Sequence, residues 1–260
     1  MKKYQLDLTV KSIEHLNEKY VLIKLTDEKP LPEMLPGQFV NIRIDNADTF
    51  LRRPISINYV DVEKNELHLL VAAVGEGTKW LASCSAGDKI NMLLPLGNGF
   101  TSPSKLSKDK AVLLIGGGVG VAPLLNYGKV LKDNGITPVF LLGARSAKDL
   151  LLLDSFKAIG ETYVTTEDAT LGDKGFVTNS SYVEGDLAAK VGKISCCGPK
   201  PMMVAVARMA KEKGVACEVS LENMMACGLG ACLCCVEKTV KGNVCVCKEG
   251  PVFDIEELNW

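Results

Sequence analysis

The stretch "AVLLIGGGVGVAPLLNYGKVLKDNG", residues 111–135, passes from an apolar run through a glycine-rich turn into a helical pattern. The continuous apolar run is typical of a strand covered on both faces of a parallel sheet. Residues 121–135 show helical spacing and end at a glycine, a common helix stop. Glycines at such a turn let the backbone approach a phosphate, and the helix N-terminus offers free N–H groups. The stretch predicts a nucleotide site formed by Gly116, Gly117, Gly118, Gly120 and Pro123.

This turn differs from the usual dinucleotide fingerprint, because Pro123 stands where G-x-G-x-x-G has its third glycine. Proline is tolerated in the first turn of a helix, where its missing N–H costs nothing. The alternative is a tight strand–helix turn that binds nothing. Three adjacent glycines and a fourth, at the carboxyl end of a strand, favour the nucleotide site.

The chain that follows repeats the strand–helix alternation. This order predicts a doubly wound parallel sheet. We expect strands over residues 137–144, 161–168, 193–198 and 216–222, and helices over 147–160 and 200–214.

A second turn, "CCGPKPM" at residues 196–202, follows a later strand of the predicted sheet. The carboxyl ends of parallel strands share one rim, where ligands bind in open α/β sheets. We therefore expect Cys197, Gly198 and Pro199 near the same ligand as the first turn. Cys196 is interpreted as a small residue at the strand end.

The first hundred residues have a different texture. Short alternating or β-branched segments, separated by turn signals, predict a small antiparallel barrel. The segments are residues 4–13, 20–25, 38–44, 54–60 and 66–74, and a polar linker follows at 101–110. The expected domains are a barrel over 1–103, an α/β domain over 104–222 and a cysteine-rich module over 223–260.

Two barrel segments carry phosphate-binding chemistry. "LRRPISINYV" supplies Arg53, Pro54 and Ser56, and arginine is suited to bidentate phosphate contact. "VGEGTKWL", residues 74–81, follows a strand and opens a short helix, so Gly75, Gly77 and Thr78 can offer N–H groups and a hydroxyl. An arginine at a strand edge more often has a solvated structural role. The phosphate-binding interpretation of the two segments is favoured because a predicted nucleotide-binding sheet follows them.

Six of the ten cysteines lie between Cys227 and Cys247. The spacing Cys227-x4-Cys232-x2-Cys235 is the plant-type [2Fe–2S] run, which a later cysteine completes. Zinc is the rival, since structural zinc takes thiolate pairs two to four residues apart. A disulfide framework ranks below both in a reducing compartment. "NVCVCK" alternates like a strand, so Cys245 and Cys247 are expected on one face, and spacing alone does not separate them.

The remaining cysteines are expected to be buried thiols that act as small hydrophobes. They are Cys84, Cys196, Cys197 and Cys217. Within the cysteine-rich run, Cys234 is interpreted as a bystander.

Composition narrows the class of protein further. The formal net charge of −1 gives no electrostatic support for nucleic-acid binding. The N-terminus lacks the apolar core of a signal peptide. The longest apolar stretch, residues 111–125, is shorter than the roughly 20 residues of a membrane span and contains four glycines. We expect a cytoplasmic protein with no membrane or nucleic-acid partner.

The motifs together resemble the ferredoxin–NADP reductase superfamily. "RPIS" is similar to its flavin motif, "GGGVGVAP" to its nicotinamide-dinucleotide turn and "CGPKPM" to its C-G-P-x-x-M turn. Within it, the chain resembles the family of electron-transfer subunits of NAD-dependent dihydroorotate dehydrogenase B. The shared segments are "LRRPISI", "GEGTKWL", "PLGNGF", "IGGGVGVAPL", "CGPKPM", "MACGLGAC" and "CKEGPVF".

The resemblance implies one FAD, one [2Fe–2S] cluster and NAD as the exchanging substrate. It places FAD on Arg53, Pro54, Ile55, Ser56, Leu70, Val71, Ala72, Gly75, Gly77 and Thr78. It selects Cys247, just before "EGPVF", as the fourth cluster ligand after Cys227, Cys232 and Cys235. It also implies a partner, the FMN-containing dihydroorotate dehydrogenase catalytic subunit, in a heterotetramer of two of each chain that serves pyrimidine biosynthesis.

Two alternatives stay open at this point. One is the small FAD and [2Fe–2S] subunit of an NADH-dependent ferredoxin–NADP oxidoreductase. The other, from a different class, is a zinc-stabilised nucleotide-binding module. Arg145 and Ser146 are placed where an NADP 2′-phosphate would bind, but Ser146 suits a helix N-cap equally, so the residues leave NAD and NADP open and the family suggests NAD.

No residue pattern supplies a general base for a carbon substrate. The two histidines, His15 and His68, fall in barrel strands, and no serine–histidine–acid or cysteine–histidine arrangement lies near a turn. We therefore predict an NAD-linked oxidoreductase subunit that does not oxidise dihydroorotate itself. Glu222 is equally consistent with a solvated loop carboxylate and a position near the flavin, and Trp260 is not expected to stack on flavin.

Overall fold

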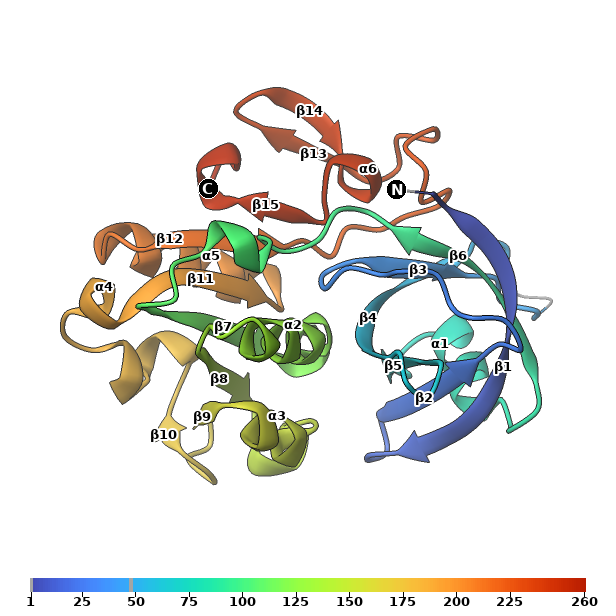
Figure 1. The fold of residues 1–260 in the computed structure, drawn as a ribbon, viewed down its shortest axis with the longest axis horizontal. Helices are drawn as coiled ribbons and strands as arrows, with labels where there is room; N and C mark the ends of the chain where they lie inside the picture. The colour runs from blue at the N-terminus through green and yellow to red at the C-terminus, as the bar shows by residue number, and fades with distance from the viewer. Residues whose placement is uncertain (1, 47–48) are drawn as a thin grey trace.

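The structure is a computed structural model that describes residues 2–46 and 49–260. Figure 1 shows a barrel beside an α/β domain, with the C-terminal segment lying across the top of both. Every helix and strand named below belongs to these described residues. None of their helices is long and apolar enough to cross a membrane.

The N-terminal part is a closed antiparallel barrel with the strand order β1-β2-β5-β4-β3-β6. Its interior is filled by inward-facing apolar residues of its strands, among them Leu8, Ile23, Ile57 and Leu69, all almost fully buried. The strands are β1 (Tyr4–His15), β2 (Tyr20–Thr26), β3 (Phe39–Ile42), β4 (Arg53–Asp61), β5 (Glu66–Ala72) and β6 (Lys89–Leu96), and helix α1 (Glu76–Ser83) links the last two.

The barrel was predicted, but one of its strands was not. β6 closes the barrel by pairing with β1 on one side and β3 on the other. Its sequence KINMLLPL alternates between polar and apolar residues only in the first half and then becomes continuously apolar with a proline. Closure of the barrel, and not the local pattern, defines this strand.

The second part is a sheet with the order β10-β9-β8-β7-β11-β12-β15, parallel throughout except between β12 and β15. The four expected strands and the opening strand are all present, so the doubly wound prediction is confirmed. The strands are β7 (Ala111–Gly117), β8 (Pro138–Ala144), β9 (Glu161–Thr166), β10 (Asp173–Lys174), β11 (Val191–Cys197), β12 (Ala216–Ser220) and β15 (Val252–Asp254).

Helices cover both faces of this sheet. The α-helices are α2 (Ala122–Asp133), α3 (Leu153–Ile159), α4 (Leu187–Lys190) and α5 (Lys200–Glu212). The short 3-10 helices are η1 (Pro103–Lys105), η2 (Gly118–Val121), η3 (Ala147–Asp149), η4 (Val177–Asn179) and η5 (Ser181–Val183).

The helix predicted over residues 147–160 is wrong in its first half. Only η3 and α3 are helical, and Leu152 between them has the left-handed φ of +54°. The leucine run packs against the core below it, with Leu151 only 3% exposed. Burying these side chains interrupts the helix, because one continuous helical face cannot hold them all.

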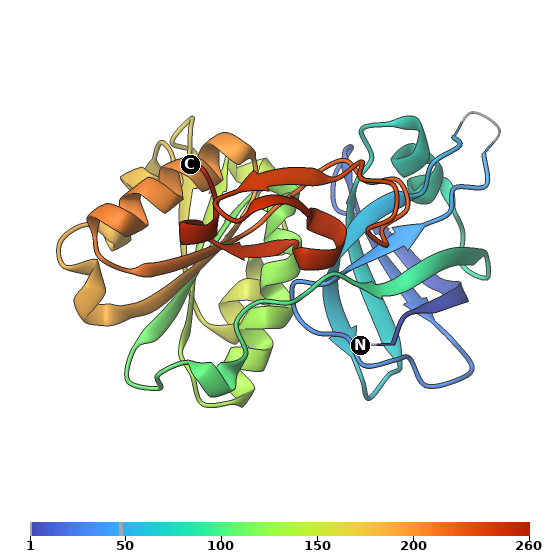
Figure 2. The ribbon, with the colours of Figure 1, turned by 90° about the horizontal axis from the view of Figure 1, so that it is seen from above.

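The C-terminal segment is joined to both other parts. It forms the hairpin β13 (Val236–Thr239) and β14 (Gly242–Cys245), helix α6 (Val246–Glu249), strand β15 and the 3-10 helix η6 (Ile255–Glu257). β15 pairs antiparallel with β12 and extends the sheet. Figure 2 shows the segment in red, spanning from the sheet to the barrel.

Helix α2 lies between the barrel and the sheet (Figure 1). Its first turn is tied to the barrel, because Asn58 Nδ2 on β4 donates to the carbonyl of Ala122 at 2.9 Å. Asn58 is 1% exposed, so this hydrogen bond is shielded from water. The glycine-rich turn before α2 is thereby placed against the strand that carries Arg53 to Ser56.

Candidate functional site

The two predicted turns of the sheet pack directly against each other. Cys197 is the register partner of Gly116, so β7 and β11 end side by side. A Cβ on Gly120 would lie 2.5 Å from Gly198 Cα, and one on Gly117 would lie 2.6 Å from Met202 Sδ. These glycines are therefore required by the close approach of the two turns, in addition to any ligand.

Gly118 is the glycine that faces open space. It has a φ of +56°, and a Cβ built on it would meet no atom within 4 Å. Its neighbours on the rim are the N-termini of α2 and α5, and a helix N-terminus is a kind of site that can bind an anion. Pro123 and Pro199 stand in or next to the first turns of these helices, where a missing N–H does no harm.

Cys197 and Glu222 meet at this rim. Cys197 Sγ lies 3.9 Å from Glu222 Oε1, across the ends of β11 and β12. Burial raises the pKa of both groups above their usual values. Glu222 as a residue is exposed, but protein atoms crowd its carboxyl group.

The barrel brings its two predicted phosphate-binding pieces together. Gly77 in α1 lies under the Arg53 side chain, since a Cβ there would come within 3.1 Å of Arg53 Nε. Arg53 Nη1 donates to the carbonyl of Leu51 at 2.7 Å, which orients the guanidinium. The Thr78 hydroxyl bonds to the backbone of Gly75 and caps α1. A cation and a helix N-terminus therefore converge, as phosphate binding requires.

The neighbouring Arg52 has a different role. Its guanidinium donates to the carbonyl of Asn41 at 3.1 Å and to Asn91 Oδ1 at 2.7 Å. Partial burial lowers its pKa below the usual arginine value. Arg52 is thus used inside the barrel, and Arg53 is the arginine available to a ligand.

We expect Arg53→Ala to weaken FAD binding by about tenfold to a hundredfold, the range for loss of a hydrogen bond to a charged group. FAD retained through gel filtration and the dissociation constant of the apoprotein measure the effect. Arg52→Ala is the matched control and should lower thermal stability while FAD stays bound. Equal FAD loss in both variants would contradict the assignment.

The barrel and sheet pieces of the site are adjacent. η2, which contains Gly118 and Gly120, contacts β5, the strand of Leu70, Val71 and Ala72. β5 is paired with β4, and Asn58 fastens β4 to α2. The residues predicted for FAD therefore border those predicted for the nicotinamide dinucleotide. This adjacency is what direct transfer between the two cofactors requires.

The cysteine loop lies against the barrel. A Cβ on Gly228, which has a φ of +69°, would come within 2.9 Å of Asn41 Nδ2 and 3.0 Å of Leu96 Cδ1. Cys235 and Cys247 are buried, Cys227 is half-buried and Cys232 is exposed. The loop thus turns one side to the barrel and the other to solvent.

Backbone N–H groups in this loop point at sulfur atoms. Leu229 donates to Cys227 Sγ at 3.3 Å, Gly230 to Cys247 Sγ at 3.1 Å and Cys247 to Cys235 Sγ at 3.4 Å. Burial opposes ionisation of Cys227, but the backbone donors outweigh it and lower its pKa to about 6. Burial and the neighbouring Cys235 raise the pKa of Cys247 to about 12. Metal coordination would deprotonate such a thiol outright.

The four predicted ligands fall into two thiol pairs. Cys232 lies beside Cys227 and contributes to its lowered pKa, and the Cys247 N–H donates to Cys235 Sγ at 3.4 Å. No group of three or more His, Cys, Asp or Glu side chains among the described residues is arranged around a single ion position. Two thiol pairs with N–H donors aimed at sulfur fit a two-iron cluster, which takes four cysteine thiolates.

The prediction that Cys245 and Cys247 share one face of a strand is wrong. β14 ends at Cys245, and Val246 begins helix α6, so the alternation stops between the two residues. Cys245 Sγ is directed at the carbonyl of Gly230 at 3.9 Å, whereas Cys247 receives the N–H of the same residue. The geometry favours Cys247 as the ligand. Cys234 is exposed and bonds only weakly, to the carbonyl of Met224.

Three of the four cysteines outside the cysteine-rich run are buried, as the sequence analysis expected. Cys196, Cys197 and Cys217 are at most 1% exposed. Cys84 is half-buried at the end of α1, with Sγ 3.5 Å from the carbonyl of Trp80.

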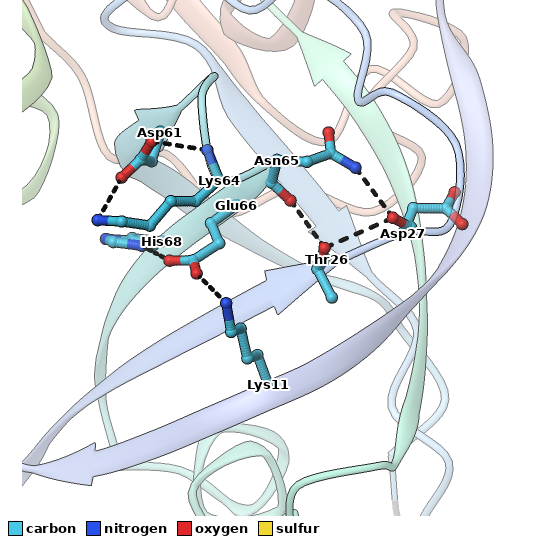
Figure 3. Close-up of polar contacts among 8 residues, drawn as sticks. All are labelled: Lys11, Thr26, Asp27, Asp61, Lys64, Asn65, Glu66 and His68. Atoms are coloured by element: carbon cyan, nitrogen blue, oxygen red, sulfur yellow. Dashed lines mark hydrogen bonds and ion pairs between the residues drawn. The ribbon is translucent and has the colours of Figure 1, made fainter.

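The histidines lie away from the rim. His15 is exposed at the end of β1. Figure 3 shows His68 paired with Glu66, which also binds Lys11, on the barrel surface; the His68 Nε2–Glu66 Oε2 distance is 2.8 Å. Burial lowers the pKa of His68 despite Glu66. The same figure shows Asn65 joined by hydrogen bonds to Thr26 and Asp27. Asn65 also lines a recess of about 650 Å³, which none of the predicted cofactor residues lines.

Two asparagines at the cluster were missed by sequence reasoning. Asn41 Nδ2 donates to the carbonyl of Ala226 at 3.0 Å, and Asn98 bonds the segment after Cys247. The sequence feature that could have identified Asn41 is its position as a polar residue inside an apolar strand. The signal for Asn98 was its place in the shared segment "PLGNGF".

A barrel with a phosphate cradle, joined to a sheet with a dinucleotide rim, defines a flavin- and nicotinamide-linked reductase. Solved structures share this fold. A NADH-dependent reduced ferredoxin–NADP oxidoreductase has a TM-score of 0.86 and 30% identity, covering 97% of this chain and 90% of that one. The ferredoxin reductase in carbazole 1,9a-dioxygenase has a TM-score of 0.68 and 20% identity, covering 83% and 67%, which indicates the fold alone.

Matches to family models and to related proteins narrow this class of reductases to one family. Residues 222–259 match the iron–sulfur cluster binding domain of dihydroorotate dehydrogenase B, and residues 114–208 match an oxidoreductase NAD-binding domain. The dihydroorotate dehydrogenase B (NAD(+)) electron transfer subunit of Fusobacterium nucleatum is 43% identical over 84% of both chains. That of Bacillus velezensis is 39% identical, over 96% of this chain and 97% of the relative. The chain belongs to the family of dihydroorotate dehydrogenase B electron transfer subunits.

Proposed function

We propose that this chain carries electrons between the flavin of a dihydroorotate-oxidising partner and NAD, through its own [2Fe–2S] cluster and FAD. The observation that carries the proposal is the order of the three sites along the molecule. The cysteine loop packs on barrel strands β3 and β6, the FAD residues lie on β4, β5 and α1, and the dinucleotide rim contacts β5. The FAD site is thus between the other two.

This order suits the chemistry of the cofactors. NAD exchanges a hydride, an iron–sulfur cluster takes one electron, and a flavin exchanges either. The chain's residues hold these groups and shield them. Arg53 and the N-terminus of α1 hold the FAD pyrophosphate, and the rim turns hold that of NAD. Cys197 and Glu222 lie at the ends of β11 and β12, beside these turns.

The rim favours NAD over NADP. Ser146 occupies the helix-cap position of η3, but its hydroxyl donates to Asp149 Oδ2 at 2.9 Å instead of capping the helix. A carboxylate beside this hydroxyl suits a ribose diol and repels a 2′-phosphate. Arg145 is exposed and makes no side-chain contact among the described residues that would direct it toward the rim.

The exposed side of the cluster module suits a protein partner. Met224 is 85% exposed and Leu233 64%, and both flank the exposed Cys232 and Cys234. Apolar side chains left in water around a redox centre indicate an interface. We assign this surface to the FMN-containing catalytic subunit, in an assembly of two copies of each chain in the cytoplasm. Electrons then enter or leave through a dry contact.

Isolated holoprotein is expected to reduce artificial acceptors with NADH and to show no turnover with dihydroorotate, because its motifs supply three carrier sites and no site for a carbon substrate. Adding the catalytic subunit should establish dihydroorotate-dependent reduction of NAD. Turnover by the chain alone would refute the division of labour. Coupling to ferredoxin and NADP in place of dihydroorotate would assign the chain to the other FAD and [2Fe–2S] subunit class.

A further inference from the structure

Asn98 connects the end of the barrel to the segment that follows the fourth cysteine of the cluster site. Its Nδ2 donates to the carbonyls of Glu249 at 2.8 Å and Val252 at 3.0 Å. Its Oδ1 accepts from the Val252 N–H at 3.0 Å, and its own N–H donates to the carbonyl of Gly250 at 2.6 Å. One residue thus makes four hydrogen bonds to a four-residue stretch that begins two positions after Cys247.

The backbone conformation of Gly97, directly before Asn98, allows the close approach of these two segments. Gly97 has a φ of +75°, and a Cβ on it would lie 2.5 Å from Pro251 Cδ and 2.8 Å from the carbonyl oxygen of Gly250. Only glycine allows the two backbones to approach so closely. Gln38 Nε2 donates to the carbonyl of Gly97 at 2.9 Å and ties this turn to the barrel.

Asn41 makes the corresponding contact at the other end of the cluster site. Its Nδ2 donates to the carbonyl of Ala226, the residue directly before Cys227. Asn41 is fully buried, and its Oδ1 has no hydrogen-bond partner among the described residues. A buried unpaired acceptor costs about 1–3 kcal/mol, so this side chain is not explained by stability alone.

We propose that Asn41 and Asn98 are positioning residues that fix the cluster relative to the flavin, an inference that rests on the proposed function. The two residues come from neighbouring barrel segments and hold the chain just before the first ligand and just after the last. β4, which carries the FAD residues Arg53 to Ser56, pairs with β3, which carries Asn41. The distance between the two redox groups therefore depends on two amide side chains.

The test measures the two electron steps separately in purified holoprotein. NADH is mixed rapidly with Asn98→Asp, Asn41→Leu and the unaltered protein, and flavin bleaching and cluster reduction are followed at separate wavelengths. The Asn98→Asp variant keeps the acceptor for Val252 but loses the donor to two carbonyls, while Asn41→Leu removes the unpaired oxygen together with the donor. Asn259→Ala is the matched control, since Asn259 makes a single contact, at 3.3 Å, in the same module.

We expect flavin reduction by NADH and its KM to match the control, while cluster reduction slows several-fold, because electron transfer weakens steeply as the distance between two redox groups grows. Hydrogen exchange of the amides at 245–252 should accelerate in Asn98→Asp, and the electron paramagnetic resonance signal of the reduced cluster should broaden. These two readouts do not depend on turnover.

Unchanged cluster reduction and unchanged exchange in both variants would overturn the proposal. Equal slowing of flavin and cluster reduction, or loss of iron from both variants, would also overturn it, because it would show general destabilisation. Failure of the unaltered protein to reduce its cluster with NADH is a different result, which would count against the proposed function itself.

Discussion

Cys247→Ala is expected to remove the iron–sulfur cluster while FAD stays bound. Cys247 is buried, it receives the N–H of Gly230 and it is paired with Cys235, so no solvent ligand can easily replace it. Loss of an outer-shell partner alone costs about 10- to 100-fold in metal affinity, and loss of a direct ligand should exceed that. Iron content and visible absorption measure the cluster, and transfer to the catalytic subunit measures its use.

Cys245→Ala is the matched control, because this thiol is only two residues away but is directed at a carbonyl oxygen. It should keep its iron and its electron transfer. NADH-driven reduction of an artificial acceptor that takes electrons from FAD should survive in both variants. Iron loss from Cys245→Ala with retention in Cys247→Ala would reverse the ligand assignment.

Gly120→Ala is expected to have the second large effect, on both stability and nucleotide use. The new methyl group would lie 2.5 Å from Gly198 Cα and 2.7 Å from the carbonyl oxygen of Cys197, and both are backbone atoms. The two rim turns would have to separate. Overpacking of this kind costs about 1–3 kcal/mol or more, which lowers the melting temperature of a protein this size by roughly 2–4 °C per kcal/mol.

The same separation displaces both turns that hold the dinucleotide. We expect kcat/KM for NADH to fall by about 10²-fold, because transfer depends on a fixed geometry. Gly118→Ala is the comparison within the same turn: it meets no atom within 4 Å, so its cost is limited to about 1–2 kcal/mol for the left-handed backbone. A Gly120→Ala protein as stable and active as the unaltered one would contradict the packing argument.

Much of the architecture was readable from local patterns. The buried strand, turn and helix at 111–135 predicted the parallel sheet, and the alternating segments before residue 100 predicted the barrel. Both rest on hydrophobic periodicity, which the chain carries without reference to its tertiary structure. β6 and the interrupted helix before α3 were not predicted, because barrel closure and core packing decide them.

The candidate sites divide in the same way. The spacing of Cys227, Cys232 and Cys235 indicated an iron–sulfur cluster, and the glycine turns indicated phosphate binding, since these chemistries need particular residue types at short intervals. Alternation put Cys245 and Cys247 on the same face of a strand and so did not show which of them is the fourth ligand. In the structure α6 begins at Val246, between the two cysteines, and directs them differently.

The sequence by itself determined most of the elements and the residue types that suit each candidate site, because both depend on residues close together in the chain. Only the tertiary structure decided how the sites meet. Arg53 over Gly77, Gly120 against Gly198 and Asn98 on the segment after Cys247 join residues that are 24 to 154 positions apart. Such contacts follow from barrel closure and sheet order, and they put the residues proposed to hold the flavin between those proposed for the cluster and the dinucleotide.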